Sequence, residues 1–375
     1  MEKLKIVTVV GTRPEIIRLS RIMPLLDEHL AQTIIHTGQN YDYELNEVFW
    51  KDLELRKPDH FLNIRTTTLG TSIGDIMFKT EAILKSEKPD AFLVLGDTNS
   101  CLAAYIAKRM HIPIFHMEAG NRCFDQNVPE EINRKIIDHI ADFNLVYTEH
   151  ARRNLLLEGF SPRRINLVGS PMAEVLKYYK PKIQKSRIIG ELHLKPQNYF
   201  LASIHREENV DNKENLEKIL YILNQLVKIY DMPIVVSTHP RTRKRLETMK
   251  DYSIDLKVLF MKPFGFYDYI YLQQNSKCVI SDSGTISEES SMLSFPAISI
   301  RQSMERPEAQ DAGSIILTGF DPRSVLNAIK ITLSDYQTRT SDRIADDYKI
   351  PDTSWRVLKL IQGNAKLSNL WWGIK

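Results

Sequence analysis

Two carboxylates follow predicted parallel strands, and a third stands at the start of a predicted helix. Asp97 follows the apolar run of residues 92–95, and Glu118 follows the next apolar run, residues 112–115. Consecutive strands of a doubly wound sheet bring their carboxyl ends to one edge, where such folds bind ligands. Glu130 comes one polar loop later, at the predicted start of a helix. The spacing predicts a group of acids that could transfer a proton to or from a substrate.

A histidine and a glycine turn form a second polar group, later in the chain. His205 follows a predicted strand, and a histidine beside a phosphate can donate a proton or a hydrogen bond to a leaving group. Ser283 and Gly284 follow another strand, where backbone N–H groups can hold a phosphate. Glu288 or Glu289, one turn later, could accept ribose hydroxyls.

Each of these residues also has a purely structural interpretation. A single histidine after a strand is more often a structural hydrogen-bonding group, and acids at strand ends often cap the following helix. The first turn is similarly ambiguous: Gly11 ends a strand, and Arg13 and Arg18 lie in the helix that follows, so an anion site and a plain connection are equal alternatives. Neither G-x-G-x-x-G nor a P-loop is present.

Alternating strands and helices position these residues. Their order predicts an α/β protein with two doubly wound parallel sheets, in domains at residues 1–179 and 180–354, and a tail at 355–375 that crosses back to the first. Residues 180–196, which are polar and flanked by prolines, are the predicted linker. Strands are predicted at residues 5–10, 33–37, 92–95, 112–115, 144–147, 165–168, 199–203, 234–237, 256–261, 278–281 and 296–300. Helices are predicted at residues 15–28, 45–53, 70–85, 101–110, 130–140, 215–230, 324–333 and 355–361.

Composition excludes several classes of protein. The 375 residues are 43% hydrophobic, and 50 basic against 47 acidic residues give a net charge of only +3, so neither a nucleic-acid nor a membrane partner is expected. No apolar run approaches the roughly 18 residues of a membrane span. Three dispersed cysteines, without C-x-x-C or H-E-x-x-H, predict no disulfide framework and no metal, and fit a reducing cytoplasm.

Several separated strings together resemble one family, the non-hydrolysing UDP-N-acetylglucosamine 2-epimerases. These strings are GTRPE from Gly11, LGDT from Leu95, HMEAG from His116, PEEINR from Pro129, HREEN from His205, SDSG from Ser281, EE from Glu288 and ERPE from Glu305. The resemblance implies a GT-B type fold, in which two Rossmann-like domains face each other across a cleft. It implies a homodimer that binds a UDP-sugar and needs no cofactor, neither NAD nor a metal. It also implies anti elimination of UDP to a 2-acetamidoglycal, followed by re-addition of UDP.

The matched motifs carry the family's functional residues to this chain. The implied catalytic residues are Asp97, Glu118, Glu130 and His205. The implied UDP-binding residues are Arg13, Arg18, Arg134, Phe264, Ser283, Gly284 and Glu289. The residues do not tell which carboxylate is the base at C2.

Departures from the common members indicate a branch of the family. Residues 39–43 replace a segment that belongs to an allosteric site, and Arg18 replaces a lysine. The string EAGNRCFDQNVPEEINRK, with GQNYDY and PFGFYDY, is similar to the branch of capsule and O-antigen pathways that makes UDP-N-acetyl-L-fucosamine from UDP-2-acetamido-2,6-dideoxy-β-L-talose. The predicted sugar-recognition residues are Asn121, Arg122, Phe124, Asp125, Gln126 and Asn127. The alternatives are a UDP-N-acetylglucosamine 2-epimerase, a GT-B glycosyltransferase and a catalytically silent UDP-sugar binding module.

Overall fold

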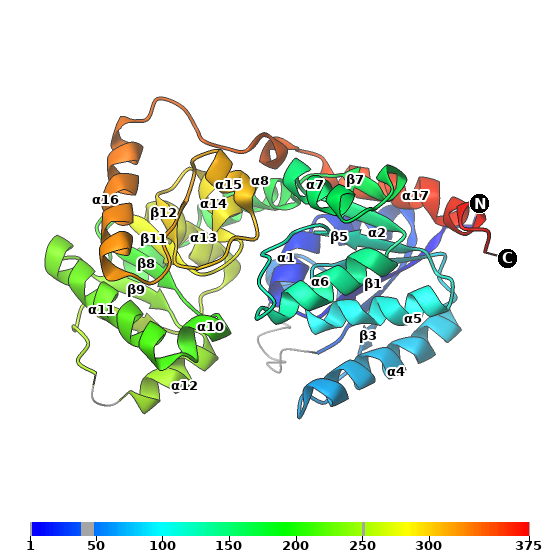
Figure 1. Ribbon diagram of the computed structural model, residues 1–375, viewed down its shortest axis with the longest axis horizontal. Coiled ribbons are helices and arrows are strands. Elements are labelled where there is room, and N and C mark those ends of the chain that lie inside the picture. The colour runs from blue at the N-terminus through cyan, green and yellow to red at the C-terminus, as the bar shows by residue number, and fades with distance from the viewer. Residues whose placement is uncertain (1, 39–48, 250–251, 375) are drawn as a thin grey trace. The chain divides into compact units, whose positions relative to one another are not determined.

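The chain forms two compact units in the computed structural model, which describes residues 2–38, 49–249 and 252–374. The first unit comprises Met1–Leu176 and Asp346–Lys375, and the second comprises Lys177–Ala345 (Figure 1). The first boundary therefore falls slightly before the predicted 179/180, and the return to the first unit begins before the predicted residue 355. Each unit is described by itself below.

The first unit is built on a parallel sheet. Within its described residues, seven strands lie in the order β3-β2-β1-β4-β5-β6-β7. Their bounds are β1 (Lys5–Val10), β2 (Ala31–His36), β3 (His60–Phe61), β4 (Ala91–Leu95), β5 (Ile114–Met117), β6 (Phe143–Val146) and β7 (Ile165–Leu167). The central strands consist of apolar and β-branched residues that are buried, as expected for a sheet covered on both faces.

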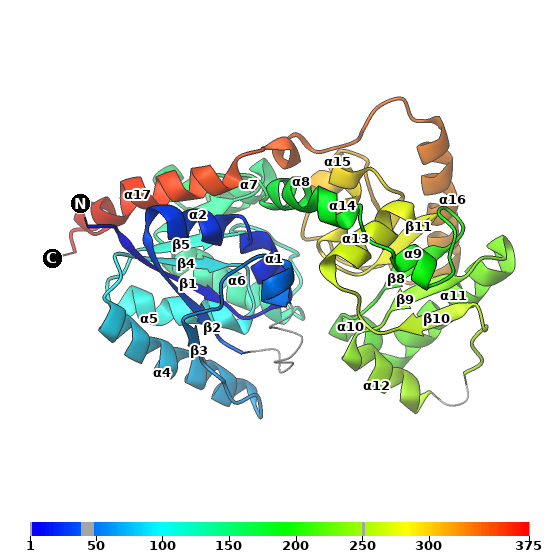
Figure 2. The same ribbon diagram turned by 180° about the vertical axis from the view of Figure 1, so that it is seen from behind.

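Helices cover both faces of this sheet. They are α1 (Arg13–Leu19), α2 (Ile22–His29), α4 (Leu69–Glu87), η1 (Asn99–Leu102), α5 (Ala103–Arg109), α6 (Pro129–Ile140), α7 (Glu149–Leu157), η2 (Pro162–Arg164), η3 (Asp346–Lys349) and α17 (Thr353–Trp371). Figure 2 shows that the C-terminal α17 lies beside α2. Its first turn is fixed by a hydrogen bond from Thr353 Oγ1 to the Val168 carbonyl (3.0 Å) and from Ser354 Oγ to Glu174 (2.9 Å).

The helix predicted at residues 15–28 is wrong in one respect, because it is two helices. Continuing α1 into α2 would require an N–H from Pro24 to the carbonyl of Ser20, and proline has no N–H. The chain therefore ends α1 at Leu19 and restarts at Ile22.

The second unit repeats the architecture. Its described residues contain six parallel strands in the order β10-β9-β8-β11-β12-β13. The strands are β8 (Phe200–Ser203), β9 (Ile234–Ser237), β10 (Val258–Met261), β11 (Cys278–Ser281), β12 (Ala297–Ser299) and β13 (Ile316–Leu317). The helices are α9 (Ile188–Glu191), α10 (Glu207–Val210), α11 (Lys213–Tyr230), α12 (Pro240–Thr248), α13 (Phe266–Asn275), α14 (Ile286–Leu293), α15 (Pro307–Asp311) and α16 (Pro322–Thr338), while α8 (Met172–Ile183) runs across the boundary of the units.

The linker predicted at residues 180–196 is also wrong, since much of it is helical. It contains the end of α8 and all of α9. Ile183, Ile188 and Ile189 are buried among the polar residues of this segment, and burial of these apolar side chains holds the two short helices on the fold.

In both sheets the strand order reverses at a topological switch point, on either side of which successive strands are added in opposite directions. In the first unit it lies between β1 and β4, and in the second between β8 and β11. Ligands of doubly wound folds bind outside the carboxyl ends of the strands at such points. Within three residues after the ends of these four strands lie Arg13, Asp97, His205 and Ser283. No helix in the described part of the chain is long and apolar enough to cross a membrane.

Candidate active site

The turn after β1 is packed closely against the loop after β4. A Cβ added to Gly11 would lie 1.8 Å from Ser100 Oγ and 2.5 Å from Thr37 Oγ1, so only glycine fits there. Arg13 begins α1, and its guanidinium lies 5.9 Å from the centre of the Phe49 ring. This packing places Arg13 at a helix N-terminus beside the switch point, where an anion would be favoured.

Glu15 links the two loops of this switch point. Its Oε2 accepts hydrogen bonds from the backbone N–H of Gly11 (2.6 Å) and Thr12 (3.3 Å), and its Oε1 accepts one from Thr98 Oγ1 (2.6 Å). Burial raises the pKa of Glu15 to about 7, against the lowering effect of these donors. Because Thr98 directly follows Asp97, Glu15 fixes the separation between the Arg13 turn and the Asp97 loop. The sequence motif contained Glu15, but its type and position alone did not indicate this role.

Asp97 is paired with Arg134 of α6. Arg134 Nε donates to Asp97 Oδ2 (2.9 Å), and Arg134 Nη1 donates to Glu131 Oε2 (2.6 Å). Glu131 is fully buried and also accepts the backbone N–H of Cys123 (3.1 Å). Arg134, predicted to bind UDP, therefore lies between two carboxylates in the first unit. Glu131 directly follows Glu130 in the acidic pair of the sequence but was not among the implied catalytic or UDP-binding residues, and the structure gives it the role of holding Arg134 and the loop before α6.

Glu118 is held in a strained backbone conformation. Its φ is +64°, which is uncommon for a residue with a side chain and often marks a functional position. The buried carboxylate forms an ion pair with Arg18, the second predicted UDP-binding arginine of this unit. Glu130 is half-buried in the first turn of α6, next to Glu131.

A fully buried network fixes the loop that carries Glu118. His116 lies 2.9 Å from Asp138 through Nδ1 and 2.9 Å from the Gly96 carbonyl through Nε2, so it connects the ends of β4 and β5 to α6. Arg122 Nη1 donates to Asp138 (2.7 Å). Burial alone would raise the pKa of the Asp138 carboxyl, but His116 and Arg122 outweigh it and hold the pKa below its ordinary value.

Arg122 was predicted to recognise the sugar, and its surroundings do not fit that role. Its side chain has no exposed surface, and besides Asp138 it contacts Glu158 through Nε (2.7 Å) and Nη2 (2.6 Å). The guanidinium is thus committed to two carboxylates, as a bidentate arginine commonly is. Arg122 supports the loop instead of facing a ligand in this structure.

The remaining residues of the predicted sugar-recognition segment differ in exposure. Asn121 is buried, whereas Phe124 is 74% exposed with a φ of +56°. Asp125 Oδ1 accepts the backbone N–H and the side-chain amide of Asn127, both at 2.9 Å, which closes the turn. Gln126 is exposed. An aromatic side chain in a left-handed, solvent-exposed position is costly to fold, and this favours a role in binding.

The turn after β11 carries Ser283 and Gly284, the predicted phosphate-binding residues of the second unit. Ser283 Oγ lies 2.9 Å from Thr285 Oγ1 and accepts the backbone N–H of Thr285 (3.3 Å). A Cβ on Gly284 would lie 2.8 Å from Arg306 Nη1 and 3.0 Å from Glu305 Oε2. Glycine at this position therefore allows an arginine to approach the turn closely, and Arg306 Nη1 donates to the Gly284 carbonyl (2.6 Å).

Three arginines and two glutamates surround this turn. Arg206 and Arg301 both contact Glu305, at 3.2 Å and 3.0 Å, and Arg306 contacts Glu288 at 3.4 Å. Arginine guanidinium groups bind phosphates through paired N–H donors, which suits a diphosphate. The HREEN and ERPE strings contained Arg206 and Arg306 but not Arg301, and the sequence did not show that the three residues meet.

His205 is attached to the same turn through Asp282. The backbone N–H groups of His205 and Arg206 donate to Asp282 Oδ2 (3.0 and 2.9 Å), and His205 Nδ1 lies 3.2 Å from Asp282 Oδ1. The second unit contains two further predicted residues: Phe264 lies between β10 and α13, and Glu289 is a buried residue of α14 that accepts from Gln273 Nε2 (2.7 Å). The structure thus brings together His205, Ser283 and Gly284 in the second unit.

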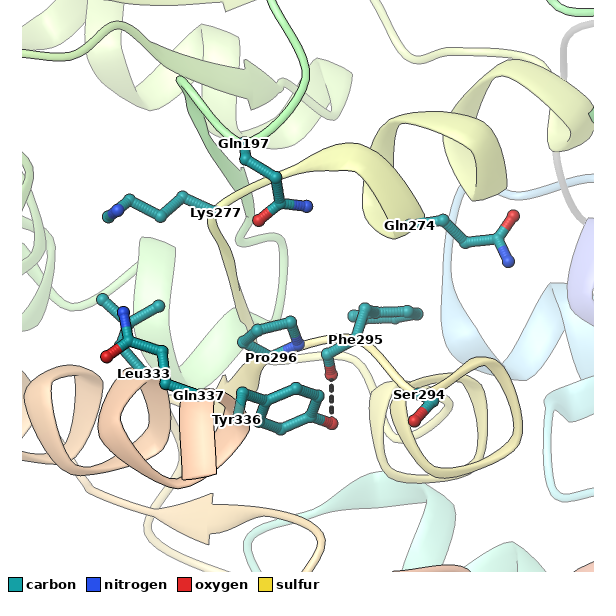
Figure 3. A pocket seen from close by; sticks show the side chains of 9 residues that line it. All are labelled: Gln197, Gln274, Lys277, Ser294, Phe295, Pro296, Leu333, Tyr336 and Gln337. Carbon is teal, nitrogen blue, oxygen red and sulfur yellow. Dashed lines mark hydrogen bonds between the residues drawn. The ribbon is translucent and has the colours of Figure 1, made fainter. Parts of the chain in front are cut away.

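A surface hollow in the second unit is separate from these residues. It has a volume of about 260 Å³ (Figure 3). Lys277 and Pro296 of its wall directly precede β11 and β12, so it lies at the amino ends of the strands. The Tyr336 hydroxyl donates to the Phe295 carbonyl (2.6 Å) in this wall. The hollow is therefore at the wrong end of the sheet for the candidate site.

The part of the chain that the structure describes contains no group of three His, Cys, Asp or Glu residues that could hold a metal ion. Cys101, Cys123 and Cys278 are free and buried. Residues 39–43, which replace the allosteric segment of common family members, lie outside the described residues.

Comparison with known proteins places the fold and the motifs in one group. Residues 25–362 match the family model described as UDP-N-acetylglucosamine 2-epimerase. A solved structure of UDP-N-acetylglucosamine 2-epimerase from Rickettsia bellii is 47% identical, with a TM-score of 0.90 and coverage of 98% of both chains. The Methanocaldococcus jannaschii enzyme in complex with UDP-GlcNAc and UDP is 34% identical, with a TM-score of 0.88 and coverage of 96% of this chain and 100% of that one.

One relative has another substrate in its name. The UDP-2,3-diacetamido-2,3-dideoxy-D-glucuronate 2-epimerase of Pseudomonas aeruginosa is 34% identical over 336 residues, which are 88% of this chain and 92% of the relative.

The solved structures and the two parallel sheets confirm the predicted GT-B type fold, with two Rossmann-like doubly wound domains.

Proposed function

The chain belongs to the UDP-N-acetylglucosamine 2-epimerase family, as an isomerase that acts on a UDP-sugar, and we propose that its substrate is UDP-2-acetamido-2,6-dideoxy-β-L-talose. The product is then UDP-N-acetyl-L-fucosamine. The observation that carries the choice of sugar is the segment of residues 121–127, which differs from common members beside the catalytic motifs and exposes Phe124.

The proposed reaction needs only proton transfer and cleavage of one bond. A base removes the proton at C2, the C1–O bond to UDP breaks, and its electron pair leaves with the diphosphate. The C1–C2 double bond of a 2-acetamidoglycal forms. An acid then returns a proton to the opposite face of C2 while UDP adds back at C1. Because no electrons are gained or lost overall, the scheme requires no redox cofactor.

The residues of the first unit suit the proton transfers. Asp97 and Glu118 each stand at the carboxyl end of a central strand and are each oriented by an arginine. Glu130 lies in the first turn of α6, the helix that also carries Arg134. We assign these three carboxylates to the chemistry at C2, as general base and general acid.

The residues of the second unit suit the diphosphate. Ser283 and Gly284 offer a turn at a helix N-terminus, with the Arg306 guanidinium at the Gly284 carbonyl. We assign them, with Arg13 of the first unit, to stabilising the negative charge that develops on departing UDP. We assign His205 to a hydrogen bond or proton donated to that leaving group.

Phe124 gives a physical reason to prefer a 6-deoxy sugar. Such a sugar carries a methyl group where UDP-N-acetylglucosamine carries a hydroxymethyl group. An exposed aromatic ring gains from covering a methyl group, and it would leave a hydroxyl without a hydrogen-bond partner. UDP-N-acetylglucosamine remains the second candidate, because that sugar is in the names of the Rickettsia and Methanocaldococcus proteins.

Incubation in D₂O tests the reaction. The protein with a UDP-sugar alone should incorporate deuterium at C2, seen by NMR as loss of the C2 proton signal. A glycosyltransferase would need an acceptor and leave C2 protonated, and a silent binding module would bind UDP without exchange. Glu118→Gln should keep UDP binding and slow exchange by about 100-fold. A rate near that of the wild type would remove the catalytic role of Glu118.

Parallel assays with the two sugars test the substrate. We expect turnover of the 6-deoxy-L-talose derivative at a kcat/KM at least about tenfold above that of UDP-N-acetylglucosamine. Phe124→Ser should lower the first value about tenfold and leave the second within about twofold. Phe78→Ser is the matched control, since Phe78 is 75% exposed and lies on α4. Turnover of UDP-N-acetylglucosamine alone would reverse the choice of substrate.

The homodimer and the cytoplasmic location stay predictions.

A further inference from the structure

Asp282 is a fully buried carboxylate at the switch point of the second sheet. It directly follows β11, whose last residue Ser281 pairs with Ser203 of β8, and its own N–H donates to the Ser203 carbonyl (3.2 Å). The carboxylate therefore lies between the strand that carries the phosphate turn and the loop that carries His205.

The two oxygens of Asp282 have different partners. Oδ2 accepts from the backbone N–H groups of His205 (3.0 Å) and Arg206 (2.9 Å) and from Asn209 Nδ2 (2.7 Å). Oδ1 lies 3.2 Å from the ring nitrogen Nδ1 of His205 and also 3.2 Å from its backbone nitrogen. One oxygen thus braces the loop, and the other faces the imidazole ring.

This division has a consequence for the histidine. A carboxylate oxygen can only accept, so it selects the ring form that carries a proton on Nδ1. Nε2 is then the nitrogen left for a ligand, and the His205 side chain is 40% exposed. His239 is the neighbouring ring, with its centre 6.0 Å from that of His205.

We propose that Asp282 is a positioning residue that holds His205 by Nδ1–H and thereby leaves Nε2 for the departing diphosphate. This rests on the proposed function of His205. The ring that acts on the diphosphate is the imidazolium, which carries protons on both nitrogens: Nδ1–H is held by Asp282, whose negative charge offsets that of the ring. When the C1–O bond breaks, its electron pair goes to the diphosphate oxygen, and Nε2–H donates a hydrogen bond to that oxygen. On re-addition of UDP the bond to C1 forms again, and Nε2 keeps its proton.

Asp282→Asn separates the two tasks of the carboxylate. With its carbonyl oxygen in the Oδ2 position, asparagine can still accept hydrogen bonds from the three donors that Oδ2 has now, which are the backbone N–H groups of His205 and Arg206 and the Asn209 side chain. Its NH₂ group then faces His205 Nδ1, which must accept, so the ring stays neutral with its proton on Nε2, and the negative charge that stabilises the imidazolium is lost. Asn209→Ala is the matched control, because it removes one bracing hydrogen bond and leaves the contact to the ring.

The test measures which ring nitrogen of His205 carries the proton and, in a separate assay, the rate of C2 epimerisation. In ¹⁵N-histidine NMR spectra, assigned with His205→Gln, the neutral His205 ring of the wild type should carry its proton on Nδ1, and that of Asp282→Asn on Nε2. The kcat for C2 epimerisation should fall about 100-fold in Asp282→Asn, with the Kd for UDP within about threefold. Asn209→Ala should keep the Nδ1–H form and a kcat within about threefold of the wild type, with lower stability.

Three results would overturn the proposal. A wild-type ring protonated on Nε2 would do so even if Asp282→Asn failed to fold. An unchanged kcat in a folded Asp282→Asn would do so as well, and so would a loss of kcat in Asn209→Ala as large as in Asp282→Asn. If no UDP-sugar is epimerised by the wild type, the proposed function fails, while the ring form still decides whether Asp282 orients His205.

Discussion

Replacing Glu15 by glutamine should change how the stability of the first unit depends on pH. The pKa of this carboxyl is raised from 4.5 to about 7 by burial. The folded state then holds the proton more tightly than the unfolded chain, so the stabilisation is complete below pH 4.5 and is lost as the pH rises through 7. The difference between the two pKa values corresponds to about 3 kcal/mol.

Glutamine is a close replacement for the protonated side chain. Its carbonyl oxygen can accept the Gly11 and Thr12 N–H groups that Glu15 Oε2 accepts, and its NH₂ group can donate to the Thr98 hydroxyl. The free energy of unfolding of Glu15→Gln minus that of the wild type should therefore increase by about 3 kcal/mol between pH 4.5 and pH 8.

Tryptophan fluorescence can follow the unfolding of the first structural unit, which contains Glu15. The four tryptophans are Trp50, Trp355, Trp371 and Trp372, all in the first unit. Urea unfolding followed by this signal at several pH values gives the difference curve. Glu28→Gln, which removes an exposed carboxylate of α2, is the control. A difference curve that is flat between pH 4.5 and pH 8 would refute the argument from burial.

Two further substitutions test the geometry of the site. Gly284→Ala should weaken UDP binding about tenfold in calorimetry, because its Cβ would meet Arg306 Nη1 at 2.8 Å. Gly190→Ala is the control and should leave the affinity unchanged, because its Cβ meets nothing within 4 Å. Equal affinities of the two variants for UDP would contradict the close packing of this turn. Arg122→Met should lower the free energy of unfolding by about 3 kcal/mol, because it leaves Asp138 buried without its guanidinium. A changed KM for the sugar with unchanged stability would restore the sugar-recognition role of Arg122.

Local patterns in the sequence predicted most of the fold. Runs of apolar residues bounded by turns identified β1 at its observed bounds, and helical spacing identified α6 and α11 within two residues of their start. Where the prediction of elements failed, a single residue or a short contact decided the outcome. Pro24 divides a periodic helix, and the two-residue strands β3 and β13 exist because they pair with β2 and β12.

Polar networks were less predictable than strands. The motifs supplied Asp97, Glu118 and His205, but the partners that hold them come from distant parts of the chain. Asp282 is 77 residues from His205, and Glu118 is 100 residues from Arg18. Spacing along a strand or helix cannot reveal such contacts, since they depend on which loops the sheet order brings together.

The pairing of acids with arginines in the first unit links two predicted roles. Arg18 contacts Glu118 and Arg134 contacts Asp97, so two of the three predicted UDP-binding arginines of this unit are bonded to a predicted catalytic carboxylate. Unpaired, these acids would repel a diphosphate, and their arginine partners offset that repulsion. The same arginines have further N–H groups and could orient the acids while they attract the phosphates. Removing either arginine should therefore affect both UDP binding and the chemistry at C2, unlike removal of His205, which should affect mainly the chemistry.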